Sequence, residues 1–312
     1  MIIAPDTIKS GLDEIVFQNY EIEKQPGEVR ADDSLFFRQM QADWGVIQYA
    51  ESMGPGSFSE VADDEEVPDA TVRVGNKTTA DIKTYENDLP IPQAYQEDSE
   101  KYGTVEEWAR DMGVRARTTR DKFAFRRSYA DAFTGVTTPD AVALISASHV
   151  SLSGDTIDNL ETGVANADNV AILIRTLRLM KAQDGDLASF HADGLLAPVK
   201  LHPTLTEITK SELKSGTANN NLNYLSDIYP GLVVGASEYL DSDYNSYNAN
   251  ADTSYFAVSK MHKISRHQRI AFNTEYIGPE YSKKRIAYLR GRFRERVAAQ
   301  SWSGVVGSNG TV

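Results

Sequence analysis

The first 80 residues carry their apolar side chains in short patches separated by acidic residues, and this feature constrains the fold most strongly. Within residues 1–43 the patches are Ile2-Ile3, Ile15–Phe17 and Leu35–Phe37. Patches this short and this far apart cannot build a core of their own, so they must be buried against another surface. We therefore predict that residues 1–43 form an extended arm that packs on something outside itself.

The pattern over residues 44–80 predicts a long β-hairpin. Two β-prone stretches, VIQYA and ATVRV, flank the turn-rich SMGPGS and the acidic run Asp63, Asp64, Glu65 and Glu66. A two-stranded hairpin is at best marginally stable alone in water. The hairpin therefore needs an outside surface as well.

A long helix is expected next. Thr104 and Glu107 fit a capping box, and apolar residues recur behind them at steps of three and four. A helix from there to about Gly135 would have some 30 residues and a length of about 45 Å. Its polar side carries six arginines, which either lie in solvent or pair with acids of another element or subunit: Arg110, Arg115, Arg117, Arg120, Arg126 and Arg127.

Helices and strands alternate through the centre of the chain. We expect helices over residues 167–183 and from Pro203 to Gly216. Strands are expected at LLAPV, at GLVVGASEYL and at Tyr255–Val258. This alternation predicts an α/β portion with a buried sheet.

Near the end of the chain, Arg290, Arg292, Arg294 and Arg296 occur at every second position. Period two favours a β-strand. A helix would also satisfy the spacing of the intervening apolar residues, but Gly291 would cost it about 1 kcal/mol. The final WSGVVGSNGTV is expected to be a Gly/Ser tail.

Charge and composition exclude several classes of protein. The net charge is −13, and no cysteine is present, so disulfides, thiolate metal sites and a cysteine nucleophile are excluded. An acidic chain argues against a dedicated nucleic-acid binder, and no apolar run approaches the roughly 20 residues that a membrane span needs. Residues 51–100 hold 13 acids and 3 bases, whereas residues 251–312 hold 4 acids and 11 bases. These opposite charges can meet within one chain or between two copies.

No motif for catalysis or cofactor binding is present. The phosphate-binding GxxxxGK[ST], the nucleophile elbow GxSxG and the zinc-binding HExxH are all absent. We interpret His262 and His267 as ordinary surface or interface residues. The acidic run lacks the alternating ligands and glycine of a calcium loop, so a solvated loop is favoured. We therefore predict no catalytic, cofactor-binding or metal-binding residue, and a chain that is not an enzyme.

Four stretches carry a resemblance when taken in order. They are FSEVADDEEVPDATVRVGNKTTADIKTYENDLPIP, YGTVEEWARDMGVRARTTRDKFAFRRSYADAFTG, LISASHVSLSGDTIDNL with the segment through LHPTL, and RIAYLRGRFRERVAAQSWSGVVGS. In this order they resemble the E-loop, the spine helix, the passage into the A-domain and the last P-domain strand of a known family. That family is the major capsid protein of tailed double-stranded-DNA bacteriophages, which has the Hong Kong 97-type fold. Each motif is short, and their collinearity carries the likeness.

The resemblance implies an α+β fold with five parts. They are an N-terminal arm (1–43), an E-loop hairpin (44–80), a P-domain with the spine helix (81–140), an A-domain (141–265), and the P-domain return strand with the C-terminal tail (266–312). No long scaffolding segment precedes the arm, which implies a scaffold that is separate, absent or already removed. Nothing near Lys77 or Lys83 identifies a covalent cross-link.

The resemblance also implies a structural role. The chain would self-assemble in the host cytoplasm, as pentamers and hexamers, into the icosahedral shell of a virion around packaged double-stranded DNA. Implied partners are further copies of the chain and, where present, a scaffolding protein, a portal and a decoration protein. DNA would be contacted only non-specifically, and no membrane is involved.

Two alternatives remain open at this point. One is an encapsulin-like shell around a protein cargo, and the other is a soluble hydrolase with a scattered site. For a shell of either kind, the candidate contacts between subunits are the acidic run and two sets of arginines: Asp63, Asp64, Glu65, Glu66, Arg115, Arg117, Arg120, Arg290, Arg292, Arg294 and Arg296.

Overall fold

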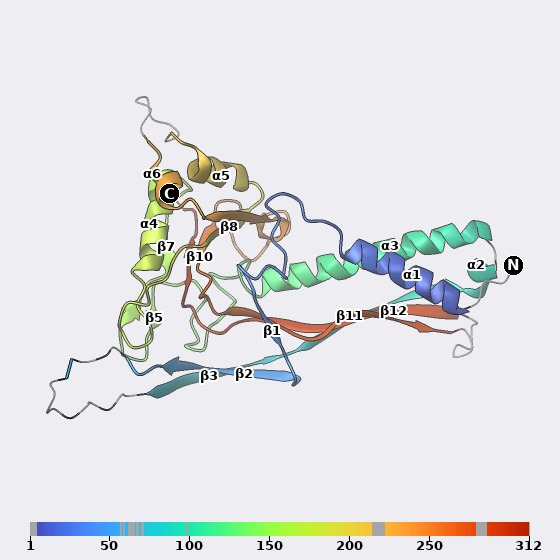
Figure 1. Cartoon of the computed structure of the whole chain (residues 1–312), viewed down its shortest axis with the longest axis horizontal. Helices are drawn as coiled ribbons and strands as arrows, with labels where there is room; N and C mark the ends of the chain where they lie inside the picture. The colour runs from blue at the N-terminus through green and yellow to red at the C-terminus, as the bar shows by residue number, and fades with distance from the viewer. Residues whose placement is uncertain are drawn as a thin grey trace.

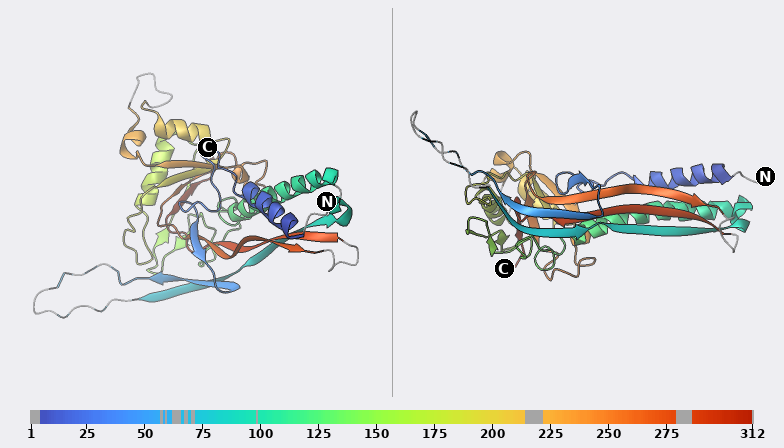
Figure 2. Two further views of the ribbon diagram at one scale, coloured as in Figure 1. Left: turned by 45° about the vertical axis from the view of Figure 1, so that its right-hand side comes forward. Right: turned by 90° about the horizontal axis from the view of Figure 1, so that it is seen from below.

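The chain folds into an elongated half, a triangular half and a hairpin along one edge (Figure 1). The computed structural model describes residues 5–56, 58, 60–61, 66, 69, 72–97, 99–213, 222–278 and 286–311. Seen from below, the body is long and thin, with its strands running along its length (Figure 2). The expected α+β class is confirmed, since helices and strands are both abundant and the sheets are mixed.

A four-stranded sheet in the order β1-β11-β12-β4 forms the elongated half. Its strands are β1 (Arg38–Gln41), β4 (Lys83–Pro92), β11 (Ile264–Ile277) and β12 (Ile286–Ala299). Strand β1 runs parallel to β11, and the other pairs are antiparallel. Residues of β12 alternate between half-buried and buried, as period two predicts for a strand with one covered face. The strand expected from the arginine row is therefore confirmed.

The long helix α3 (Ser99–Arg126) and helix α1 (Pro5–Tyr20) cover one face of this sheet. Helix α3 lies along it, with α1 beside α3 and the short α2 (Gln93–Glu97) at the far end (Figure 1). Leu12 and Val16 of α1 are fully buried against α3 and β12. A Cβ at Gly113 would lie 2.3 Å from the Val16 carbonyl oxygen, so the two helices can approach this closely only with glycine there.

The prediction of an extended arm is wrong for residues 5–20. Leu12, Ile15 and Val16 stand three to four residues apart, and this spacing gives α1 an apolar stripe that the chain's own sheet and spine helix cover. The later arm residues Phe36 and Phe37 are also buried within the same chain. The described part of the arm therefore does not depend on a second copy for its burial, and Ile2 and Ile3 lie outside the described residues.

The expected long helix is present, with shifted ends. It begins at Ser99, so Thr104 lies inside the helix and does not cap it. It ends at Arg126 rather than near Gly135, because the chain then turns and buries Tyr129 and Ala130 in the central core. Burying these side chains stabilises the chain more than extending the helix into solvent by another turn would.

The triangular half contains a five-stranded sheet in the order β7-β13-β10-β8-β9. Its strands, in that order, are Leu160–Glu161, Val305–Ser308, Tyr255–Val258, Gly194–Pro198 and Val233–Ser237. Short strands β5 (His149–Val150) and β6 (Thr156–Ile157) pair beside it, and the 3-10 turn η1 (Glu238–Leu240) follows β9. The three strands predicted in the central portion are all present.

Helices α4 (Ala167–Arg178), α5 (His202–Lys210) and α6 (Tyr224–Ile228) pack in this half. Asn166 caps α4, because its side chain accepts a hydrogen bond from the backbone N–H of Asn169. Helix α4 ends five residues before the predicted end. The residues that follow it are not helical, and Lys181 forms an isolated β-bridge with Leu187. Helix α5 also ends early, at Lys210, and Gly216 lies outside the described residues.

The closing segment is a core strand and not a tail. Strand β13 lies between β7 and β10, and Trp302 just before it is fully buried. A Cβ at Gly307 would stand 3.0 Å from side chains of Ile145 and Phe256. Glycine at position 307 therefore allows close packing, and the predicted Gly/Ser tail is wrong for the described residues of this segment.

Candidate assembly surfaces

The hairpin of β2 (Val46–Met53) and β3 (Arg73–Asp81) forms a separate two-stranded sheet. It runs along one edge of the molecule (Figures 1 and 2). Val46, Val72 and Val74 are 48%, 66% and 64% exposed, and Phe58 is fully exposed. Apolar side chains in this number on a two-stranded ribbon indicate a surface that another protein covers.

The paired strands are also anchored to the body, at a point toward the turn end of the ladder. Glu51 is buried and accepts a hydrogen bond from Asn76 at 3.5 Å. Burial, and then the nearby Asp140 carboxylate, raise the pKa of Glu51. Asp140 is itself paired with His149 at 2.7 Å. The hairpin is thus fixed to the body through Glu51, while Val46 at its base and Val74 near its turn stay exposed.

The acidic run falls almost entirely outside the description. Asp63, Asp64 and Glu65 lie outside the described residues, and Glu66 is exposed. Their role as contacts between subunits stays a prediction.

The arginine row of β12 projects from the sheet face opposite the helices. Arg290 forms a forked ion pair with Asp88 of β4, at 2.7 and 2.9 Å, and Arg292 lies 2.9 Å from Glu86. The pairing raises the pKa of Arg290 and lowers that of Asp88. These two arginines were expected to pair with acids of another element or copy. Their acids stand directly opposite on the neighbouring strand of the same chain.

Glu86 and Asp88 were missed in the sequence, although a signal was available. They alternate along β4 at the same period of two as the arginines along β12. Cross-strand neighbours of opposite charge on one sheet face stabilise a register. Arg294 lies opposite Thr84 and has no acidic neighbour in that register, and Arg296 lies beyond the end of β4.

The three helix arginines have different surroundings. Arg115 is exposed and pairs with Asp111 one turn earlier at 3.3 Å. Arg117 is half-buried and lines a cavity of about 500 Å³ between the arm and the triangular half. Arg120 is buried, so it is not available to another copy in this conformation.

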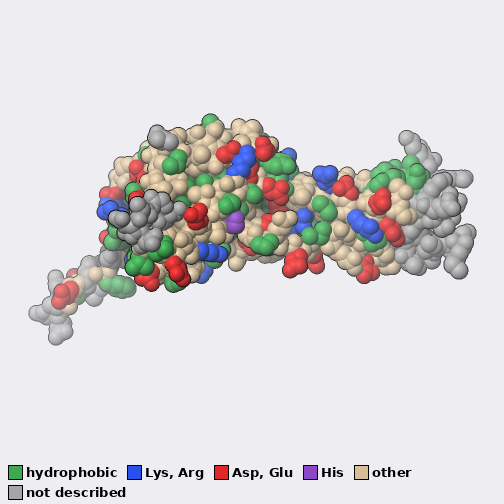
Figure 3. Space-filling view, turned by 90° about the horizontal axis from the view of Figure 1, so that it is seen from above, with side chains coloured by type: hydrophobic (Ala, Val, Ile, Leu, Met, Phe, Trp, Pro, Cys, Tyr) green, Lys and Arg blue, Asp and Glu red, His purple; other side chains and the backbone are tan. Residues whose placement is uncertain are grey.

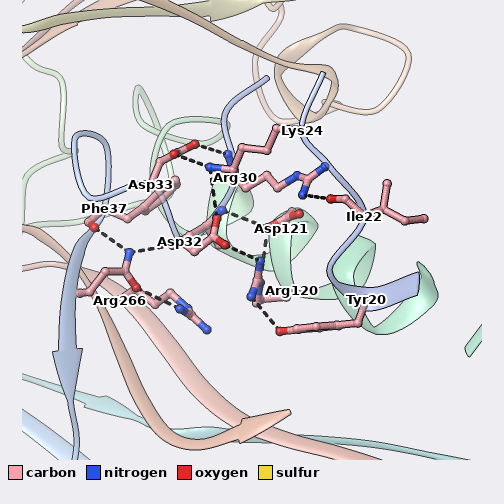
Figure 4. A network of polar contacts seen from close by, with 12 residues as sticks. Tyr20, Ile22, Lys24, Arg30, Asp32, Asp33, Phe37, Arg120, Asp121 and Arg266 are labelled. Atoms are coloured by element: carbon pink, nitrogen blue, oxygen red, sulfur yellow. Dashed lines mark hydrogen bonds and ion pairs between the residues drawn. The ribbon is translucent and has the colours of Figure 1, made fainter. Parts of the chain in front are cut away.

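Arg120 belongs to a buried network that fastens the arm to the spine helix (Figure 4). It donates to the Tyr20 hydroxyl at 2.7 Å and lies 3.5 Å from both Asp32 and Asp121. Asp121 in turn accepts a hydrogen bond from the backbone N–H of Ala31 at 2.9 Å. Burial raises the pKa of Asp121, whereas for Asp32 the charges of Arg120 and Lys24 outweigh burial and lower the pKa.

Two further arginines extend this network. Arg30 donates to the carbonyl oxygens of Ile22 and Glu23, and Arg266 of β11 donates to Gln39 and to the buried Glu295. The arm is thus held by charged groups from three elements as well as by its apolar residues. This network could not be predicted from the sequence, because the acids and arginines that form it lie far apart along the chain.

The interpretation of two histidines as surface residues is wrong. His262 and His267 are 0% and 4% exposed, and burial lowers the pKa of His262 to about 4. His262 Nδ1 accepts from the backbone N–H of Ile264, which fits a neutral ring. Within the described part of the chain, no group of three or more His, Asp or Glu residues is placed to hold a metal ion. Within the same ranges, no helix is long and apolar enough to cross a bilayer.

Acidic and basic side chains are interspersed along the face of the body seen from above (Figure 3). No broad basic patch gathers among the described residues on this face. A non-specific DNA surface would need such a patch.

No protein-family profile and no curated protein matches the sequence. Solved structures do match over nearly the whole chain. The capsid of Ralstonia phage GP4 has a TM-score of 0.56 at 10% identity, covering 92% of this chain and 94% of its own. The capsid of Myoviridae phage XM1 has a TM-score of 0.53 at 13% identity, covering 93% and 94%. The virus-like particle from Pyrococcus furiosus also has 0.53, at 9% identity, covering 96% and 98%.

These likenesses show the fold. The chain shares its overall fold with subunits of phage capsids, over 92–93% of this chain and 94% of theirs. The Hong Kong 97-type capsid fold expected from the collinear motifs is therefore confirmed.

Proposed function

We propose that the chain is the major capsid subunit of a tailed double-stranded-DNA bacteriophage. Copies would associate as pentamers and hexamers into an icosahedral shell that encloses the packaged genome. The observation that carries this proposal is the hairpin with its exposed valines and Phe58, on a fold shared with solved phage capsids. Such a ribbon is stabilised when a neighbouring copy covers it, because burying its apolar surface contributes about 25 cal/mol per Å².

The same proposal includes the virion as the site of the protein, assembly in the host cytoplasm, and the five-part division given by the family resemblance. Scaffolding, portal and decoration proteins would be partners where the phage encodes them. Contact with DNA would be non-specific. The role would be structural rather than enzymatic, in line with the capsid subunits that share the fold.

A compartment shell with a protein cargo is the second candidate. The virus-like particle from Pyrococcus furiosus supports it, because that subunit matches 96% of this chain. The two candidates differ in the contents of native particles. Double-stranded DNA inside them favours the phage head, whereas a protein cargo without genome favours the compartment. A soluble hydrolase is the third candidate and requires turnover by a discrete small oligomer.

Electron microscopy of the purified protein tests the proposal directly. We expect shells or ring-shaped capsomers, because every copy presents the same hairpin and the same body. Protein concentration and salt should be varied, since many weak contacts assemble only above a threshold. A monodisperse monomer or dimer under all of these conditions would contradict a shell of either kind and favour the hydrolase.

The acidic run gives a separate prediction about salt. Replacing Asp63, Asp64, Glu65 and Glu66 together by Asn and Gln should move the salt concentration at half-assembly by about twofold, because complementary charges orient encounters and salt screens them within about 10 Å at 0.1 M. Light scattering across a salt titration measures this. An unchanged curve would refute pairing by these acids and leave the fold untouched.

A further inference from the structure

Strand β12 continues beyond the end of its neighbour β4. The last pair between them joins Glu295 to Lys83, whereas residues 296–299 pair only with β11 among the described strands. At this point the chain passes from the hairpin strand β3, ending at Asp81, into β4. The open edge of β12 therefore lies where the hairpin joins the body.

A cavity of about 360 Å³ occupies this junction, and we name it the hinge pocket. The hairpin contributes Tyr49 and residues 78–80, the segment after the spine helix contributes Arg127 and Asp131, and β12 contributes Arg296. A ligand in the hinge pocket would touch the hairpin and the body at once.

The charges around the hinge pocket are not balanced by the described residues. Arg126, Arg127 and Arg296 line it together with one acid, Asp131. Oδ1 of Asp131 is already used, because it accepts from the Thr134 hydroxyl at 2.6 Å and the Gly135 backbone N–H at 2.8 Å. Arg126 is exposed and lies 4.8 Å from the centre of the Tyr247 ring, so Arg127 and Arg296 are the two charges that face the engaged carboxylate.

Arg127 and Arg296 are the unusual members of the set. The Nε atom of each is buried and has no hydrogen-bond partner among the described residues. Burial lowers the pKa of Arg296, and the charge of Arg127 lowers it further. The acid that acts on Arg296 is Asp81, which is 63% exposed and pairs with Lys83 at 3.5 Å. Two guanidinium groups therefore repel each other in a half-buried space.

We propose that the hinge pocket binds an oxyanion, a phosphate or a carboxylate, between Arg127 and Arg296. Guanidinium groups bind such anions through paired N–H donors, and an anion would turn the repulsion into attraction. Because the pocket joins hairpin and body, the bound anion would fix the orientation of the hairpin. The anion has two sources, free phosphate or a side-chain carboxylate of a second copy.

Inorganic phosphate is the first probe, titrated into unassembled protein by calorimetry and thermal unfolding. At about 100 times its dissociation constant it should raise the Tm by about 4 °C. Arg296→Gln and Arg127→Gln should each weaken phosphate binding at least tenfold. Arg290→Gln is the matched control, because Arg290 pairs with Asp88 outside the pocket, and it should bind phosphate normally. Without phosphate, Arg296→Gln should not lower the Tm, since it removes a repulsion.

An assembly assay distinguishes the two possible sources of the anion. If phosphate does not bind, yet Arg296→Gln weakens assembly at least tenfold while Arg290→Gln does not, the anion is a carboxylate of a second copy. If phosphate binds equally to all variants, or if it binds to none and the variants assemble alike, the proposal is wrong. The phosphate titration needs no shell, so its result stands apart from that of the capsid proposal.

Discussion

A protein in which Met53 is joined to Arg73 through an Asn-Gly turn should fold and fail to form shells. These two residues pair across β2 and β3, so a two-residue turn closes the shortened hairpin without changing its register. The variant loses the exposed Phe58 and the acidic run together. We expect particle formation to be abolished and the Tm to change by less than about 3 °C, because the core clusters contain none of the described residues of the removed segment.

Electron microscopy and thermal unfolding of the same sample check both halves of this expectation. Phe58→Ser keeps the hairpin at full length and should weaken assembly in part, whereas Glu66→Gln removes one charge from the same segment and should matter less. Normal shells from the shortened protein would show that the outer hairpin is not an interface. A large drop in Tm would instead show that the outer hairpin contributes to the stability of the folded subunit.

Arg120→Leu should lower the free energy of unfolding by about 3–5 kcal/mol, because it leaves Asp32 and the buried Asp121 without their shared cation. Arg115→Leu is the matched control on the same helix. Its guanidinium is exposed and, among the described residues, forms an ion pair only with Asp111, so the change should stay within about 0.5 kcal/mol. Urea unfolding of unassembled protein measures both. Equal losses would contradict a special role for the buried network.

The deficit of Arg120→Leu should shrink as the pH is lowered. Arg120 holds the pKa of Asp32 below its unfolded value, so the stability from this pair is present at neutral pH and is lost as the pH falls through the folded pKa. Asp121, whose pKa is raised by burial, takes up its proton at a higher pH, and the unpaired carboxylate is then neutral. A deficit that is constant from pH 7.5 to pH 3, which extends below the ordinary aspartate pKa of about 3.9, would indicate lost packing rather than lost charge pairing.

Periodic and local features of this fold were predictable from the sequence. The hairpin, the arginine strand and the buried strand Tyr255–Val258 follow from alternation and turn residues, and the long helix follows from its spacing. Features that depend on distant partners were not predictable. Helix α1 has apolar residues at helical spacing (Ile8, Leu12, Ile15 and Val16), but its close packing at Gly113 of the spine helix could not be read from the sequence.

The candidate contacts show the same limit. Four arginines in a row predict one charged face, yet two of them are neutralised by β4 and Arg296 faces another arginine across a cavity. In the sequence, Arg120 could not be distinguished from its exposed neighbours, because its position on the helix does not reveal that the arm packs over it. The pairing between strands and the path of the arm determine which charged side chains lack a partner within the chain. Neither can be predicted from the neighbouring residues in the sequence.

The central place of β13 has a consequence for protein synthesis. Strand β10 emerges from the ribosome about 50 residues before residues 305–308, and until then its edge toward β13 has no partner in this sheet. Nascent chains would expose that edge for several seconds at ordinary translation rates, long enough for polysome neighbours to associate wrongly. Ribosome stalling upstream of Val305 should therefore yield aggregated, chaperone-bound chains, and competent subunits should appear only after this last strand has been inserted.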